Sequence, residues 1–308
     1  DLRIISGAKT AGVRPGVILG HEFAGRVAAV GRGVDGVPVG AQVTCSIVVS
    51  CQRCRACLSG REQLCENLVL FGYELDGGLA EYLLVPRIAM DHGNLVVLEK
   101  EIPATTLALA EPVSCCLNGA GQVAVAPGES VVVLGTGPIG LLHIALAKLA
   151  GATTILAAGR EGRLAAATDF GATCAVALTG EALTAEVRER TNGRGADVVI
   201  VAVGDLSLAN QALELAAIGG RVNYFAGFPK GRTASIDPNL IHYRELAVTG
   251  GSNARRADVR RAVELLSSGA LDVGRLVTHR FPLAELDAAV TAVARRDGLK
   301  VAVMPAAG

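Results

Sequence analysis

The chain has 308 residues, of which 51% are apolar, and its 29 basic side chains balance its 29 acidic ones. A zero net charge gives no general attraction to nucleic acid or to an anionic membrane, and no uncharged apolar run of about 18 residues is present to span a bilayer. The length suggests two domains. Because the sequence shows no signal peptide, we expect a cytoplasmic protein with no nucleic-acid or membrane partner.

The first 60 residues predict short strands separated by glycine-rich turns. Apolar segments at 26–31 and 38–43 lie beside glycines, a pattern that favours a small, mostly β domain or barrel. The turn before the first segment contains His21 and Glu22, and imidazole and carboxylate are both good zinc donors. A solvent-facing pair at a turn is the alternative interpretation.

Four cysteines that lie close together in the sequence predict a structural metal site. With two, two and seven residues between them, they are Cys51, Cys54, Cys57 and Cys65. Four thiolates in so short a loop can surround one zinc ion as a tetrahedron and leave no position open for a substrate. In an α/β protein of this kind, half of the eight cysteines within fifteen residues indicates a metal rather than disulfides.

Glu111 lies where the sequence predicts the end of a helix. Residues 103–110 begin with a proline and have helical character, and Pro112 disfavours the helical conformation for the residue before it. We therefore expect the helix to break at Glu111 and to turn its carboxylate inward. A carboxylate exposed at a helix end is the alternative.

The centre of the chain contains the pattern of a dinucleotide-binding βαβ unit. A strand-like run, a run of helical length and a second strand-like run lie at residues 131–134, 141–150 and 153–158. The loop between the first strand and the helix contains Gly135, Gly137, Pro138, Ile139 and Gly140. Glycines at this spacing turn the chain, let backbone N–H groups approach a pyrophosphate, and let helix and strand pack closely. A glycine-rich turn without a ligand is the alternative.

Six apolar runs with helical stretches between them predict a doubly wound parallel sheet. They lie at residues 131–134, 153–158, 173–178, 197–203, 221–226 and 246–250. Such a sheet binds its ligand at the carboxyl ends of its strands.

The end of the second of these strands favours NADP over NAD. A carboxylate that grips the ribose 2′-hydroxyl should lie about twenty residues after the glycines. The sequence there has Ala158 and Gly159 instead, and Arg160 and Arg163 follow. A guanidinium matches the geometry of a phosphate, so a 2′-phosphate is the natural partner. In the alternative, Arg160 is a solvated residue at a helix start and Glu161 turns toward the ribose.

In this order and spacing, these motifs resemble the zinc-dependent medium-chain alcohol and polyol dehydrogenases. The motifs are Gly20-His21-Glu22, the four cysteines, Glu111-Pro112 and the glycine loop. Within that superfamily the sequence is most similar to the sorbitol (L-iditol) and threonine dehydrogenase branch. The resemblance implies an α/β fold with a GroES-like, mostly β catalytic domain at 1–113 and 253–308, whose N-terminal part is missing. A Rossmann-type dinucleotide-binding domain is implied at 114–252.

The resemblance also implies roles for the candidate metal ligands. His21 and Glu111 would reach a catalytic zinc, Glu22 is a ligand in the polyol branch, and Asp1 would steer His21 from a second layer. The family's cysteine ligand lies three residues before the aspartate that matches Asp1, so it is not in this chain, and neither is the hydroxyl residue that relays the alcohol proton. A catalytic zinc is therefore expected only if that cysteine exists.

Other segments receive expectations from the same resemblance. Val203 and Phe225 would line the nicotinamide and ribose pocket, and Lys300 would lie near the cofactor pyrophosphate, with an exposed lysine at a strand end as the alternative. Residues 77–86 would form a strand after the cysteine lobe. The returning segment predicts a helix, a strand and a helix at 257–266, 277–283 and 284–294.

The resulting hypothesis is an oxidoreductase that moves a hydride between a secondary alcohol, polyol- or cyclitol-like, and NADP or NAD. Zinc would act as a Lewis acid on the substrate oxygen. The alternatives are a catalytically impaired homologue that only binds a dinucleotide and a zinc-free reductase of the same fold. The family implies a homodimer or homotetramer formed through the edge strand of the cofactor domain.

Overall fold

The computed structural model describes residues 1–305 and divides into two compact units. The first unit contains Asp1–Ser114 and the segment from Asn253 onward, and the second contains Cys115–Ser252. Among the helices of residues 1–305, none combines the length and the apolar character needed to cross a membrane.

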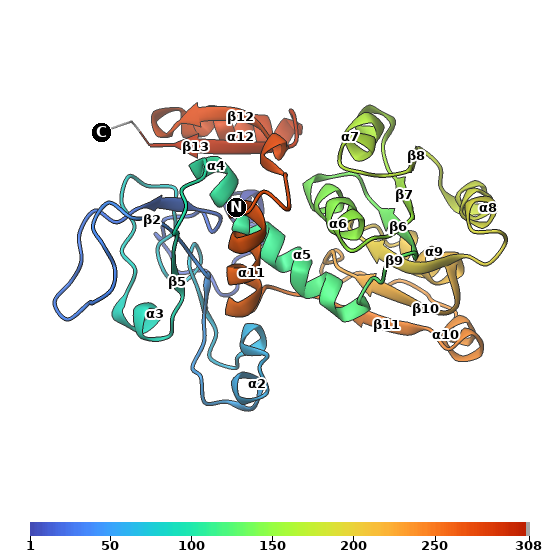
Figure 1. Ribbon diagram of the computed structural model, residues 1–308, viewed down its shortest axis with the longest axis horizontal. Helices are drawn as coiled ribbons and strands as arrows, with labels where there is room; N and C mark the ends of the chain where they lie inside the picture. Colours follow the sequence, from blue (N-terminus) through green and yellow to red (C-terminus); the bar gives the residue numbers. More distant parts are fainter. Residues whose placement is uncertain (306–308) are drawn as a thin grey trace. The chain divides into compact units, whose positions relative to one another are not determined.

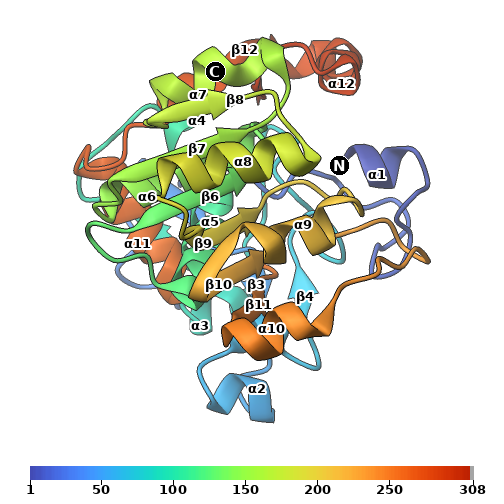
Figure 2. The ribbon, with the colours of Figure 1, turned by 90° about the vertical axis from the view of Figure 1, so that its right-hand side faces the viewer.

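The second unit is built on a six-stranded parallel sheet (Figures 1 and 2). Its strands are β6 (Ser130–Leu134), β7 (Thr154–Ala158), β8 (Cys174–Val176), β9 (Ala196–Val201), β10 (Ala216–Tyr224) and β11 (Ala247–Gly250). They are ordered β8-β7-β6-β9-β10-β11, and every neighbouring pair is parallel. The sheet is doubly wound, as the sequence predicts, and the direction of winding reverses between β6 and β9.

Helices connect the strands of this sheet. They are α6 (Pro138–Leu149), η2 (Glu161–Arg163) with α7 (Leu164–Asp169), α8 (Gly180–Arg190), α9 (Leu208–Leu215) and α10 (Pro238–Arg244). The central strand β6 is apolar and at most 2% exposed over Val131–Leu134, because helices cover both faces of a doubly wound sheet. The core that results contains Leu156, Val199 and Leu213.

All six predicted strands are confirmed, and one of them begins earlier than expected. β10 starts at Ala216 rather than near 221, and its pairing with β9 shifts register between Ala216 and Arg221. Gly219, with a φ of +72°, lies inside this irregularity. The Gly219-Gly220 pair, a combination common in loops, here marks a bulge within a strand.

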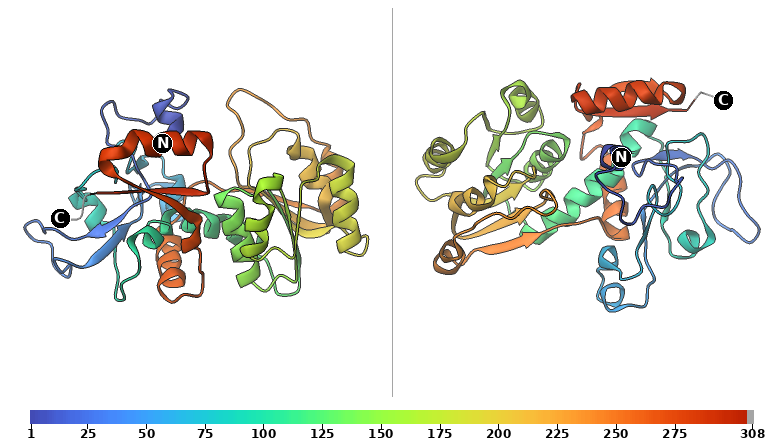
Figure 3. Two further views of the ribbon diagram at one scale, coloured as in Figure 1. Left: turned by 90° about the horizontal axis from the view of Figure 1, so that it is seen from above. Right: turned by 180° about the vertical axis from the view of Figure 1, so that it is seen from behind.

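The first unit consists of short strands and helices (Figure 3). An antiparallel sheet contains β1 (Ala24–Arg26), β2 (Gln42–Cys45) and β5 (Leu95–Val97), a second pair contains β3 (Val48–Val49) and β4 (Val69–Leu70), and β12 (Val277–Pro282) runs parallel to β13 (Lys300–Met304). The helices are α1 (Leu2–Ile5), α2 (Arg55–Leu58), α3 (Arg87–Asp91), α4 (Ala104–Leu107), α11 (Arg256–Ser267) and α12 (Leu286–Arg295), with 3₁₀ turns η1 (Glu62–Leu64), η3 (Gly274–Leu276) and η4 (Leu283–Glu285).

Three local predictions for this unit are wrong. The strand expected at 26–31 is instead β1, which ends at Arg26, and residues 27–31 form no strand. Residues 77–86, all of which the structure describes, form no strand. The helix also does not break at Glu111, because α5 (Ala110–Val123) begins at Ala110 and includes Glu111 and Pro112 in its first turn. A proline in the first turn costs no hydrogen bond, since the first N–H groups of a helix have no intrahelical acceptor. The break lies two residues earlier, between α4 and α5.

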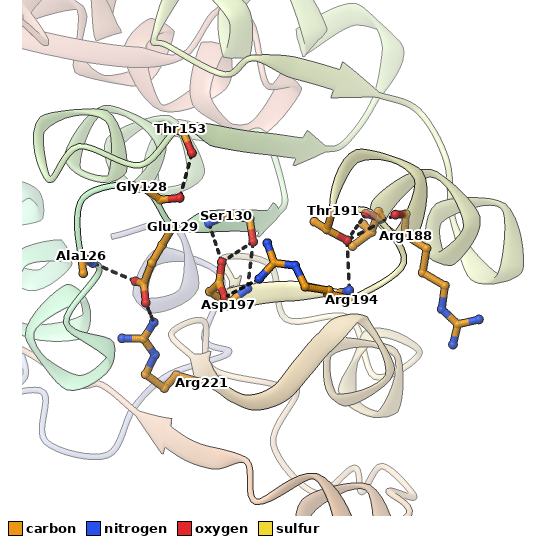
Figure 4. Close-up of polar contacts among 12 residues, drawn as sticks. Ala126, Gly128, Glu129, Ser130, Thr153, Arg188, Thr191, Arg194, Asp197 and Arg221 are labelled. Carbon is orange, nitrogen blue, oxygen red and sulfur yellow. Dashed lines mark hydrogen bonds and ion pairs between the residues drawn. The ribbon is translucent and has the colours of Figure 1, made fainter.

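A polar network fixes the amino ends of the central strands (Figure 4). Asp197 of β9 accepts hydrogen bonds from the backbone N–H and the hydroxyl of Ser130 on β6, at 2.8 and 2.6 Å. Arg221 of β10 donates to the carbonyls of Val123 and Ala124 at the end of α5, and pairs with Glu129. These contacts connect the end of α5 with β6, β9 and β10 at the amino ends of the strands, away from their carboxyl ends.

His143 on α6 is buried without a polar partner. It is 1% exposed, its ring meets that of Phe225 edge-on at 4.5 Å, and neither ring nitrogen finds a hydrogen-bond partner among residues 1–305. Burial lowers the pKa of His143 to about 3, because the charged imidazolium is poorly solvated there.

We expect this histidine to make folding sensitive to acid. Above pH 6.5 it is neutral in both states, whereas between 6.5 and about 3 only the unfolded state binds the proton, so stability falls as pH falls. Between pH 7.5 and 4.5 the loss is about 2–3 kcal/mol. Urea unfolding should show a shallower pH dependence in His143→Leu, while the exposed-site control His242→Gln keeps the wild-type dependence. Equal dependence in His143→Leu and wild type would contradict the assignment.

Candidate active site and metal centres

The four cysteines converge as the sequence predicts. Their sulfurs all lie within 4.8 Å of one another, and the Sγ of Cys54 is 3.5 Å from that of Cys57 and 3.9 Å from that of Cys65. Sulfurs at the corners of a zinc tetrahedron with bonds of about 2.3 Å are about 3.8 Å apart. The donor set and its spacing therefore fit a zinc ion.

The charges of this lobe also favour a cation. Backbone N–H groups of Arg53 and Cys54 lower the pKa of Cys51 to about 6. Burial, followed by the neighbouring sulfurs of Cys54 and Cys65, raises the pKa of Cys57 to about 12. Four thiols this close cannot all ionise unless a positive ion offsets their repulsion, which is what a thiolate-bound metal provides.

A contact missed in the sequence holds the cysteine lobe in place. Arg256, at the start of α11, donates from its backbone N–H to Glu62 in η1 at 3.1 Å and from its guanidinium to Ser50 at 3.1 Å. Ser50 directly precedes Cys51, and Glu62 lies between Cys57 and Cys65. The contact spans about 200 residues of sequence, so no local pattern predicts it.

The second group of candidate ligands also converges. One ligand atom each from His21, Glu22 and Glu111 lies within 4.8 Å of the others. His21 and Glu22 come from the turn before β1, and Glu111 comes from the first turn of α5. The pairing of 18–20 with 77–79 fixes that turn, with Gly77 donating to Ile18 and Gly78 to Gly20, both at 2.7 Å.

The glycines of that pairing allow a close backbone approach. A Cβ on Gly77 would lie 2.2 Å from the carbonyl oxygen of Gly20, and one on Gly78 would lie 2.4 Å from the Cβ of Phe23. The Gly77-Gly78 pair is a sequence signal from which the pairing of 18–20 with 77–79 could have been predicted. We instead predicted a strand at 77–86.

Asp1 lies where the resemblance places it. Its Oδ1 is 3.6 Å from Nδ1 of His21 and accepts a hydrogen bond from the backbone N–H of Gly20 at 3.3 Å. Nδ1 of His21 is buried and has no hydrogen-bond partner within residues 1–305, so the nearby carboxylate favours a proton on it. Nε2 then keeps its lone pair for a metal.

Lys300 pairs with Glu22 rather than standing alone at a strand end. Its ammonium, at the start of β13, meets the Glu22 carboxylate within the first unit. Burial by itself raises the pKa of Glu22, but Lys300 and His21 together hold that pKa below its usual value. The expected contact of Lys300 with a cofactor pyrophosphate stays a prediction.

The glycine loop has the geometry that a pyrophosphate needs. Gly135 has a φ of +109°, and a Cβ on Gly140 would lie 1.8 Å from the carbonyl oxygen of Gly135. A Cβ on Gly137 would meet nothing closer than Nη1 of Arg163, at 3.8 Å. The loop is thus packed tightly on its inner side and open beside Gly137, where α6 begins at Pro138, so it fits a bound phosphate.

The ends of β7, β9 and β10 carry the other predicted cofactor residues. Arg160 is exposed after β7, and Val203, 41% exposed after β9, lies beside Gly135. Gly159 has no room for a side chain, since its Cβ would lie 2.0 Å from Oγ1 of Thr136. Phe225 packs on His143, so its role in lining a nicotinamide pocket stays a prediction.

Comparisons with known proteins show the family of this chain. Residues 1–92 match the alcohol dehydrogenase GroES-like domain, and residues 138–268 match the zinc-binding dehydrogenase family. The L-threonine 3-dehydrogenase of Caldanaerobacter subterraneus is 33% identical over 298 residues, which cover 95% of this chain and 83% of that one. The chain belongs to the zinc-dependent medium-chain alcohol dehydrogenases.

Two further relatives support this membership. The L-galactonate-5-dehydrogenase of Escherichia coli is 33% identical over 87% of this chain and 77% of its own. A structure from Sinorhizobium meliloti, described as a zinc-binding dehydrogenase bound to NADP, superposes with a TM-score of 0.91 and 34% identity over 99% of this chain and 87% of that one.

As a medium-chain dehydrogenase, the protein transfers a hydride between a secondary alcohol and NAD(P), with zinc and a nicotinamide dinucleotide as cofactors. The family and the α/β fold with a GroES-like domain are confirmed, and a zinc-free reductase is not supported.

The cysteine lobe provides a test that is independent of catalysis. Cys57→Ser should lose one zinc equivalent per chain, and its Tm should fall by roughly 10 °C, because a structural zinc contributes folding free energy directly. Elemental analysis and thermal unfolding measure both. Cys174→Ser, which changes a thiol of the other unit, is the matched control and should leave both quantities unchanged. A Cys57→Ser protein with the wild-type zinc content would refute the site.

Proposed function

We propose that this dehydrogenase oxidises the secondary hydroxyl of a polar, polyol- or cyclitol-like substrate, or reduces the matching ketone, and prefers NADP to NAD. The convergence of His21, Glu22 and Glu111 within 4.8 Å is the observation that carries the proposal. Two relatives are named for threonine and galactonate, both polar secondary alcohols.

In the proposed mechanism, Nε2 of His21 and the carboxylates of Glu111 and Glu22 hold the catalytic zinc. A zinc ion at such a site supplies Lewis-acid polarisation of a substrate oxygen. Asp1 keeps the proton of His21 on Nδ1 and so fixes the orientation of the ring. Lys300 offsets the charge of Glu22, which lets two carboxylates lie side by side.

On the cofactor side, the backbone around Gly137 and the amino end of α6 would bind the pyrophosphate, as the positive end of a helix dipole favours an anion. Val203 and Phe225 are proposed to position the nicotinamide. In this proposal the second unit binds and orients the dinucleotide, and the first unit polarises the substrate.

The test is activity and metal content of a ligand variant. Wild type should contain two zinc ions per chain and oxidise members of a panel that includes L-threonine, L-galactonate, alditols and cyclitols. His21→Ala should lower kcat at least roughly 100-fold, since the ligand orients the substrate oxygen, while NADP binding measured by fluorescence stays intact.

His242→Ala, at an exposed histidine of the other unit, is the matched control and should keep full activity. If wild type with two zinc ions oxidises no secondary alcohol but binds NADP, the protein is the impaired dinucleotide-binding homologue. Full activity in His21→Ala would contradict the proposed ligand set.

The preference for NADP rests on the guanidinium groups after β7. Nη1 of Arg163 lies 3.8 Å from the position of a Cβ on Gly137, beside the glycine loop, and Arg160 is exposed next to it. No carboxylate ends β7, and Gly159 cannot be replaced by one without displacing Thr136. One structural relative, at 34% identity, is bound to NADP.

Arg163→Gln should weaken NADP binding roughly 10- to 100-fold and leave NAD binding nearly unchanged, because a charge-assisted hydrogen bond to the 2′-phosphate is lost. Titration calorimetry with each dinucleotide measures the two constants. Arg188→Gln on the exposed face of α8 is the control. An equal loss for both dinucleotides would assign Arg163 to the pyrophosphate, and no loss would remove it from the site.

Assembly is a further part of the proposal. β11 lies at the edge of the six-stranded sheet, and Val248 on it is 38% exposed. Ile218 within β10 is 81% exposed, and Tyr243 in α10, which precedes β11, is 76% exposed. An apolar edge strand of this kind supports a homodimer or homotetramer formed through the cofactor domain. A cytoplasmic location stays a prediction.

A further inference from the structure

An ammonium group lies beside the candidate catalytic metal site without a carboxylate partner. Nζ of Lys9 stands 4.0 Å from the ring centroid of Tyr73, and the Tyr73 ring lies 5.4 Å from the His21 ring. All three residues belong to the first unit. The Lys9 ammonium therefore lies no farther from the centre of the His21 ring than the sum of these two distances. The His21 imidazole is proposed to hold the metal.

The charges around Lys9 leave its own charge unbalanced. Within residues 1–305, no carboxylate lies in ion-pair range of Lys9. The nearest acidic influence is Glu74, whose carboxylate already accepts a hydrogen bond from the backbone N–H of Leu70 at 2.9 Å. Burial and then the like charge of Arg3 lower the pKa of Lys9. A partly desolvated cation of this kind gains more from an incoming anion than an exposed lysine does.

Backbone hydrogen bonds hold the chain at both Lys9 and Tyr73. Lys9 donates its backbone N–H to the carbonyl of Arg3 at 2.8 Å, just after α1. Tyr73 is held in the turn after β4, where its carbonyl accepts from the N–H of Arg14 at 2.8 Å. The aromatic face attracts the ammonium and holds it over the Tyr73 ring, which in turn neighbours the His21 ring.

We propose that Lys9 binds a carboxylate of the substrate, so that the preferred substrate is a hydroxy acid rather than a neutral polyol. This rests on the proposed function, because it takes the reacting hydroxyl to be held at His21 and Glu111. The carboxylate would then lie a few carbon atoms from the reacting carbinol, across the edge of the Tyr73 ring. Aldonic acids and β-hydroxy amino acids have this arrangement, and alditols lack the anion.

Lys9 is therefore a specificity-determining residue that acts on binding. It contacts the far end of the substrate and takes no part in proton or hydride transfer. Its removal should raise KM for an acid and leave kcat, and every constant for a neutral alcohol, close to wild type.

The experiment compares matched acid and neutral substrates in the full chain with both zinc ions bound. The pairs are L-galactonate with galactitol, and L-threonine with its amide. Wild type should show a kcat/KM at least about 10-fold higher for the acid of the pair that it oxidises. Lys9→Gln should lower kcat/KM for that acid roughly 10- to 100-fold through KM, and Lys9→Arg should recover most of the loss because it restores the charge.

Lys100→Gln, at an exposed lysine of the same unit, is the matched control. A wild-type preference for the neutral partner would overturn the proposal, as would an equal loss on both partners in Lys9→Gln, which indicates a structural role. If wild type oxidises galactitol but no acid, this inference fails and the proposed function stands. If it oxidises neither acid nor neutral alcohol, both fail.

Discussion

The first unit brings the carboxylates of Glu22 and Glu111 and the imidazole of His21 within 4.8 Å of one another. This close approach is the constraint on which the unit depends. Charges on Glu22 and Glu111, whose ligand atoms lie within 4.8 Å of each other, would repel by at least roughly 3 kcal/mol at the effective dielectric constant of a protein surface. Lys300 offsets part of this cost, and close backbone packing at Gly77 and Gly78 holds the turn that contains His21 and Glu22. A divalent cation would remove the remaining repulsion, which supports the proposed metal site.

In the second unit, the constraint concerns the two ends of the parallel strands. In a doubly wound sheet the dinucleotide binds at the carboxyl ends of the strands. The contacts that fix the strands relative to one another therefore lie at their amino ends. The Asp197–Ser130 and Arg221–Glu129 contacts do this at the opposite edge (Figure 4). The glycine loop is then free to carry only the features that a pyrophosphate requires, a positive φ at Gly135 and close packing at Gly140.

The parts that the sequence predicted are those whose signals are local. Four cysteines within fifteen residues, a glycine loop between a strand and a helix, and six apolar runs each specify their own geometry through short-range chemistry. The parts that it missed depend on partners far along the chain. Lys300 is 278 residues from Glu22, and Arg256 is 194 from Glu62, so neither contact leaves a pattern in the sequence.

Context also reversed two local rules. Pro112 breaks a helix in its interior but is harmless in a first turn, and only the position of the α4–α5 break, set by tertiary packing, decides between these outcomes. The glycine pair at 219–220 suggests a loop, yet neighbouring strands carry β10 through it as a bulge. Although the helix does not break at Glu111 as predicted, Glu111 still lies at the candidate site, because it is in the first turn of α5.

Anomalous diffraction at the zinc edge from crystals of the protein tests the central claim most directly, since it locates each metal independently of activity. Two peaks per chain are expected, one about 2.3 Å from the four cysteine sulfurs and one bonded to His21 Nε2 and to the carboxylates of Glu111 and Glu22. A peak at the cysteines alone, with the Lys300 ammonium still on Glu22 and no metal at His21, would contradict it.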